Sequence, residues 1–256
     1  MRPPFCAKQS LQSFLLCLLV SSICGFPVKA QQAVAPATLS ADEVMDRVAE
    51  MNDQRSHSLA AYSGLRTYHL ECHCLAHKSA NMIVHIEFHA PVQKDFTVVS
   101  ESGSGTIRER VFKELLKAEQ ESMLLENQQH SALTRDNYTF ELLEYQKTGT
   151  SAVYVLKAQP RRSSKFLFRG RIWVDARDFA VTRIEGEPAV NPSWWTEKTN
   201  FTRTYQKIGE FWLPELNESH SKVRIFGTAV LTIEYGDYSL QTEEAKVAFS
   251  QPLPTK

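Results

Sequence analysis

The chain has 256 residues, 43% of them hydrophobic and 23% charged, and its 29 basic residues are balanced by 29 acidic ones. This apolar content is that of a globular protein with a packed core. A chain without a basic excess gives no reason to expect nucleic acid as a partner.

The N-terminus has the pattern of a secretory signal peptide. Arg2 and Lys8 make the start basic, residues 13–26 form an apolar run, and Val28 and Ala30 provide small or aliphatic residues ahead of a cleavage point. The run is shorter than the roughly 20 apolar residues of a membrane-spanning helix. We therefore expect cleavage after Ala30; a retained signal anchor is the alternative.

Removal of a signal peptide of residues 1–30 changes the inferred protein in two ways. Three basic residues leave with it, so residues 31–256 carry 26 basic and 29 acidic residues, a net charge of −3. Two of the five cysteines remain, Cys72 and Cys74, which is too few for a disulfide scaffold. We expect an exported, periplasmic protein whose partners do not include nucleic acid.

The first expected element is a helix, which follows a flexible leader over residues 31–39. Ser40, with Glu43 three residues later, has the form of a capping box, which marks the start of a helix. The apolar residues that follow at helical spacing are Val44, Met45, Val48 and Met51. The pattern predicts a helix over residues 40–54.

Strands and a second helix are expected next. From Leu59 to Ser100 apolar and polar residues alternate, which is typical of β-strands. The glycines and serines of residues 101–105 end this pattern. Residues 106–126 return to helical spacing, and the apolar residues on one side are Ile107, Val111, Leu115 and Leu116. This pattern predicts a helix over residues 106–126.

From Tyr138 onward the chain reads as a succession of strands, separated by short polar turns about every ten residues. No internal repeat interrupts residues 40–250, which we expect to form a single domain. The predicted fold class is α+β and mostly β. Its architecture is one strongly curved antiparallel sheet, an open half-barrel, with helices covering the concave face.

Residues 68–90 read as a β-hairpin whose register follows from the apolar pattern. A loop near residues 78–80 places the apolar residues of both strands on one face. We expect Cys72 and Cys74 to be buried and reduced, because residues two apart on a strand lie about 6.6 to 6.8 Å apart, at the upper limit for a disulfide. The inward pairs in this register are Leu70–Phe88, Cys72–Ile86, Cys74–Val84 and Ala76–Met82.

The outward face of this hairpin carries its histidines. The same register sets His73 against His85 and Glu71 against Glu87, with Cβ atoms about 4.5 to 5.5 Å apart. These four residues are the candidates for metal ligands. A metal site needs at least three converging ligands, whereas a flat sheet face splays side chains apart. We expect a solvated polar face that binds no metal.

The sequence carries none of the common catalytic motifs. It has no G-x-S-x-G, HExxH or phosphate-binding loop, and no spacing ties its Ser, His and Asp residues together. We therefore expect a protein that is not an enzyme and needs no cofactor. A hydrolase or a metal-dependent activity is the remaining alternative.

Two segments carry a resemblance to a known family. In residues 170–189 a Gly-x-Ile-Trp-Val-Asp strand ends at Asp175, and in residues 201–238 a hairpin closes on GEFWLP before a strand ending in YGDY. These segments resemble the bacterial outer-membrane lipoprotein-sorting proteins of the LolA/LolB superfamily, and in particular their broader exported relatives. RseB-like proteins, which use a similar domain in envelope-stress regulation, are also possible. The lipid-anchored cysteine of the LolB type has no counterpart here.

The resemblance implies a half-barrel that shelters acyl chains of lipids or lipoproteins on its concave face, or a regulatory module with an envelope protein as partner. We expect the helix over residues 106–126 to act as a lid, with the preceding SGSG (102–105) as its hinge. The apolar residues expected to line the cavity are Leu70, Phe88, Phe166, Phe168, Ile172, Ile225 and Ile233.

Overall fold

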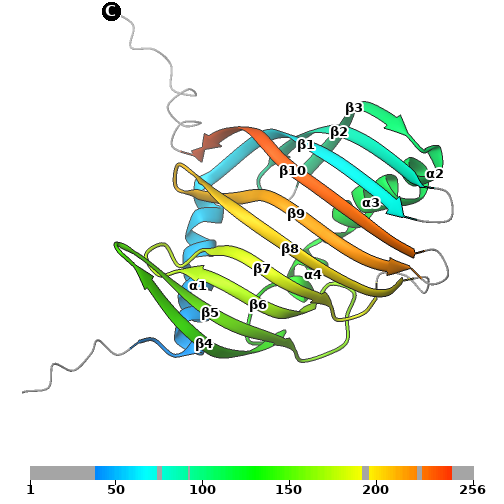
Figure 1. Ribbon diagram of the computed structural model, residues 1–256. Helices are drawn as coiled ribbons and strands as arrows, with labels where there is room; N and C mark the ends of the chain where they lie inside the picture. The colour runs from blue at the N-terminus through cyan, green and yellow to red at the C-terminus, as the bar shows by residue number, and fades with distance from the viewer. Residues whose placement is uncertain (1–37, 74–76, 92, 192–195, 224–226, 244–256) are drawn as a thin grey trace, which may run out of the picture. The chain divides into compact units, whose positions relative to one another are not determined.

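The computed structural model describes residues 38–73, 77–91, 93–191, 196–223 and 227–243. Ten antiparallel strands form one sheet with the order β3-β2-β1-β10-β9-β8-β7-β6-β5-β4. The sheet is curved and not closed into a barrel, as the sequence predicts (Figure 1). The strands are β1 (Leu59–His73), β2 (Lys78–His89), β3 (Gln93–Gly103), β4 (Tyr138–Thr148), β5 (Ser151–Pro160), β6 (Phe168–Asp175), β7 (Val181–Pro188), β8 (Thr196–Ile208), β9 (Phe211–Val223) and β10 (Gly227–Thr242).

The strand order explains why helices cross the sheet. The chain enters the sheet at β1, the third strand from one edge, and runs outward through β2 to β3 at that edge. The next strand, β4, lies at the opposite edge, and β5 to β10 return step by step until β10 pairs with β1. The segment between β3 and β4 must therefore pass from one edge to the other, and it does so as helices on one face of the sheet (Figure 1).

The first helix, α1 (Ala41–Ser58), confirms the predicted start. Ser40 and Glu43 form the capping box, with the Ser40 backbone N–H donating to Glu43 Oε2 at 2.8 Å. The helix continues four residues beyond the predicted end at residue 54. Its buried residues are Val44, Met45 and Val48.

Substitution of Ser40 with alanine removes half of this capping box. The backbone N–H of Glu43 then loses the Ser40 hydroxyl that it donates to at 3.3 Å. We expect the free energy of unfolding, measured by urea titration, to fall by about 1 kcal/mol. A change of less than about 0.3 kcal/mol would mean that the box adds little to the stability of α1.

The predicted helix over residues 106–126 is present but broken into parts. It consists of α2 (Gly105–Ile107), a π-helical turn η1 (Arg108–Phe112) and α3 (Lys113–Ser122), after which α4 (Leu125–Ser131) follows. Ile107 and Phe112 are buried, whereas Val111, Leu115 and Leu116 pack at the edge of the same cluster. The predicted apolar side is confirmed, and the π-turn brings Phe112 into it.

The register predicted for the first hairpin is wrong by eight residues, although its faces are right. Leu70 lies opposite Ala80 and Cys72 opposite Lys78, so the predicted loop at 78–80 lies within β2. A period-two pattern restricts only the parity of the register, and any even shift keeps the same face inward. The observed pairing engages β1 from Ala61 onward, which gives a longer ladder than the predicted one.

The prediction that Cys72 is reduced and buried is also wrong. Cys72 is half-buried and forms a disulfide. The other cysteines, Cys74 among them, lie outside the described residues, as do the predicted signal peptide of residues 1–30 and most of the leader over residues 31–39.

Candidate functional site

One row of paired residues crosses the helix-covered face of the sheet from β2 to β4. Directly opposed residues of antiparallel strands point to the same face, so the row can be followed from strand to strand. Its members are Met82, Tyr68, Ile233, Asn217, Arg203, Ile184, Ile172, Leu156 and Leu142. Apolar or aromatic side chains occupy both ends, and the two central positions are polar.

The two ends of this row belong to two separate apolar clusters. The α3-side cluster lies under the segment from α2 to α3 and consists of Tyr68, Leu70, Ala80, Met82, Val84, Ile86, Ile107, Phe112 and Ile233. The α1-side cluster lies under α1 and consists of Val44, Met45, Val48, Tyr154, Leu156, Ile172, Val174 and Ile184.

The residues predicted to line a cavity fall into both clusters. Leu70 and Ile233 are buried in the α3-side cluster, and Ile172 is buried in the α1-side cluster. Phe168 packs at the edge of the α1-side cluster, and the half-buried Phe88 stacks on Tyr62 with ring centroids 5.0 Å apart. The half-buried Phe166 precedes β6, and Ile225 lies outside the described residues.

The segment from α2 to α3 is anchored unevenly. Phe112 is fully buried and its ring centroid lies 5.8 Å from that of Tyr68, whereas α3 itself has no buried residue. At the start of the segment Arg108 Nη1 pairs with Glu101 Oε2 of β3 at 3.1 Å. The segment is therefore held firmly at its first turns and lightly along α3.

Charged side chains hold α3 to the sheet. Glu119 of α3 accepts hydrogen bonds from Arg66 of β1 and from Lys94 of β3, the latter with Nζ 2.6 Å from Oε1. Arg66 is 7% exposed and Lys94 10%, while Glu119 keeps 26%. The Arg66 guanidinium also lies over the Tyr235 ring at 4.8 Å. We call Glu119, Arg66 and Lys94 the latch.

The pKa of Glu119 reflects the charges that surround it in the latch. Burial by itself would raise the pKa of this carboxyl group. The hydrogen bond from Arg66 and the charge of Lys94 outweigh that effect and lower its pKa to about 2. Burial would lower the pKa of Arg66, yet the hydrogen bond to Glu119 raises it. Glu119 and Arg66 are therefore both charged at neutral pH.

The polar middle of the row lies between the two clusters. Arg203 of β8 faces Asn217 of β9, and both Arg203 Nε and Asn217 Oδ1 are buried without a hydrogen-bond partner. The neighbouring Tyr205 raises the pKa of Arg203 against the effect of burial, and Tyr235 and Glu119 contribute in the same direction.

The predicted metal candidates are not brought together. His85 lies opposite Leu65 and Glu87 opposite Ser63, far along the strand from His73. Instead, the end of the hairpin gathers Glu71, His73 and His77, with one donor atom of each within 4.8 Å of the others. This cluster is exposed or half-exposed. Its imidazole and carboxylate donors are of the kind that zinc accepts.

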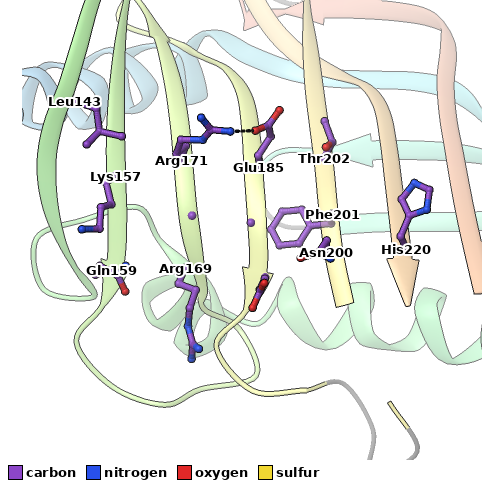
Figure 2. A pocket seen from close by; sticks show the side chains of 13 residues that line it. Leu143, Lys157, Gln159, Arg169, Arg171, Glu185, Asn200, Phe201, Thr202 and His220 are labelled. Atoms are coloured by element: carbon purple, nitrogen blue, oxygen red, sulfur yellow. Dashed lines mark hydrogen bonds and ion pairs between the residues drawn. The ribbon is translucent and has the colours of Figure 1, made fainter. Parts of the chain in front are cut away.

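A hollow of about 600 Å³ lies on the outer face of the sheet (Figure 2). Arg171 Nη2 and Glu185 Oε2 are joined across it at 2.7 Å, as Figure 2 shows. Gly170 and Gly186 allow the close approach of β6 and β7, because a Cβ on Gly170 would lie 2.0 Å from the Glu185 carbonyl oxygen. The walls of the hollow carry both positive and negative side chains, so their charge favours no single class of ligand.

No family model and no curated protein matches the sequence. Solved structures do match. The structure is similar to that of a LolA superfamily protein from Nitrosomonas europaea, with 13% identity over 80% of this chain and 94% of the other and a TM-score of 0.38. A DUF1329 family protein from Desulfovibrio piger matches with 12% identity, coverages of 84% and 98%, and a TM-score of 0.40. A putative outer-membrane lipoprotein-sorting domain from Vibrio parahaemolyticus matches with 12% identity, coverages of 79% and 94%, and a TM-score of 0.39.

None of the helices in the described part of the chain combines the length and apolar content needed to cross a bilayer.

Sequence reasoning missed the charged residues of the helix-covered face. Arg66 and Lys94 are charged residues at inward positions that are otherwise mostly apolar. This interruption of the apolar pattern is the one sequence signal that could have identified them as candidate site residues. Arg203 lies in a stretch without clear alternation, where β8 carries an irregularity between Thr204 and Tyr205. Such an irregularity hides the face to which a residue belongs.

Proposed function

We propose that the protein is a non-enzymatic carrier or sensor in the cell envelope that binds an acyl chain or another apolar ligand on the helix-covered face of its sheet. One observation carries the proposal. An apolar cluster of the sheet is covered by a helix, α3, that buries no residue of its own and is fastened by the charges of Glu119, Arg66 and Lys94.

A permanent core would not need this arrangement. Apolar helix residues stabilise a core when they are buried, and buried ion pairs are a costly way to attach a helix. Ion pairs break and form without loss of apolar packing, so they suit a cover that opens. A chain with ten methylenes buried in the α3-side cluster would gain roughly 8 kcal/mol before association costs, which is enough for micromolar binding when the site is preorganised.

A different observation favours a second function, a protein-interaction module of the cell envelope. Both clusters are packed with side chains of the protein itself. Two hollows lined by described residues lie away from these clusters, one on the outer face and one of about 580 Å³ at the C-terminal end of α1. A module of this kind would keep its helix-covered face closed and bind its partner elsewhere.

Uptake of a fluorescent fatty acid by the purified protein decides between the two. We expect saturable binding to the wild type and a loss of affinity of about tenfold or more in Leu116→Glu, because this half-buried side chain of α3 faces the cluster and a carboxylate there opposes an apolar chain. Ala118→Glu is the matched control, because residue 118 is exposed on the same helix. Its affinity should equal that of the wild type.

Wild-type protein without saturable binding would remove the carrier proposal and leave the interaction module. Equal losses in both variants would place the probe outside the α3-side cluster. Native mass spectrometry of protein purified from its own host, with extraction of bound lipid, provides an independent check on the ligand.

A further inference from the structure

The centre of the helix-covered face carries an unpaired cation. Glu119 is shared by Arg66 and Lys94. Among the described residues, no carboxylate lies within ion-pair distance of Arg203, although its guanidinium Nε is buried without a hydrogen-bond partner. Arg66 and Lys94 thus share Glu119, and Arg203 is left without a carboxylate partner among the described residues. Arg203 as a whole is half-buried, and a cation at that depth is costly unless an anionic group pairs with it.

We propose that Arg203, assisted by Asn217, binds the anionic head group of the apolar ligand, a carboxylate or a phosphate at the end of an acyl chain. The proposal rests on the function proposed above and adds the chemical class of the ligand. The planar guanidinium presents its N–H groups in a fork that matches the two oxygens of a carboxylate or phosphate.

Asn217 lies directly across from Arg203 and contributes an amide to the same spot. Its Oδ1 is also buried without a partner. A side-chain amide turned about its last bond presents N–H donors where the oxygen was, so one residue serves either an anionic oxygen or a hydroxyl of the head group. Two unpaired polar groups on neighbouring strands indicate a shared polar ligand better than either does alone.

The position of this pair suits an amphipathic ligand. On one side Asn217 adjoins Ile233 of the α3-side cluster, and on the other Arg203 adjoins Ile184 of the α1-side cluster. A chain lying in the α3-side cluster therefore ends at the polar pair. An entirely apolar ligand crossing this position would leave both groups desolvated and unpaired, which is unfavourable.

The test compares three probes on the whole protein: palmitic acid labelled with a fluorophore at its chain end, its methyl ester, and the equally labelled hexadecyl phosphate. We expect the wild type to bind at least one of the two anions about 10- to 100-fold more tightly than the ester, since a hydrogen bond to a charged group is worth about 1.5 to 3 kcal/mol. In Arg203→Gln that anion should bind only as tightly as the ester, and affinity for the ester should not change. The two anionic probes separate carboxylate from phosphate.

Arg169→Gln is the control, because Arg169 is exposed on β6 and lines the hollow of the outer face. It should bind all probes as the wild type does. If Arg203→Gln does not fold by circular dichroism, Asn217→Ala should weaken the anionic probes alone, by a smaller factor. Equal binding of acid, phosphate and ester to the wild type would overturn the head-group proposal and leave the carrier function standing. Absence of binding by all three would overturn both.

Discussion

Replacement of Phe112 with alanine is expected to detach the segment from α2 to α3 from the sheet. Phe112 is fully buried and is, with Ile107, one of the two buried side chains of this segment. Truncation of a buried phenylalanine costs about 3 to 5 kcal/mol, because apolar contact is lost and a cavity remains against Tyr68. The remaining attachments are the buried Ile107, the half-buried apolar residues of η1 and α3, the latch and the Arg108–Glu101 pair.

Hydrogen exchange of the backbone amides over residues 105–122 measures this change directly. In Phe112→Ala these amides should lose protection far more than those of α1 and of strands β5 to β7, which pack in the other cluster. Leu124→Ala is the control, because Leu124 is 61% exposed and its truncation should alter protection by less than about 0.5 kcal/mol. Uniform loss of protection through the sheet would mean that the segment is part of the core and cannot serve as a lid.

Local signals in the sequence were sufficient for the elements and for the faces of the strands. The capping box at Ser40 and helical spacing gave the start of α1 within a residue, and alternation placed Leu70 and Met82 on the same inner face, as observed. Each of these inferences needs only residues a few positions apart, whose geometry is fixed by the periods of helix and strand.

Long-range pairing could not be predicted in the same way. The register of β1 and β2 depends on how many pairs form in total, and an even shift leaves the pattern of faces unchanged. The latch joins Glu119 to Arg66, 53 residues earlier, across a helix that breaks its regular period at η1. The spacing of these charges in the sequence does not predict their contact. The contact arises because the chain crosses the sheet between β3 and β4.

Replacement of Glu119 with glutamine is expected to open the latch and to remove a pH dependence. Arg66 and Lys94 would remain buried without a carboxylate, and breaking a buried ion pair from one side costs about 3 to 5 kcal/mol. Some of this cost is relieved by the quarter of the Glu119 side chain that stays in contact with solvent. We therefore expect a loss of about 3 kcal/mol in the free energy of unfolding at pH 7, measured by urea titration.

Glu119 also sets how the free energy of unfolding of the wild type depends on pH in the acid range. Burial would raise the pKa of Glu119, but the bonds to Arg66 and Lys94 lower it from 4.5 in the unfolded chain to about 2. A lowered folded pKa gives stability that is complete above pH 4.5 and is lost as the pH falls toward 2, about 3 kcal/mol in all. Glu119→Gln should lack this part of the acid response. Glu114→Gln, which breaks only the exposed Lys117 pair on the same helix, should keep it and lose less than about 0.5 kcal/mol at pH 7. An acid response in Glu119→Gln equal to that of the wild type would show that other carboxylates govern it and that the latch does not depend on the charge of Glu119.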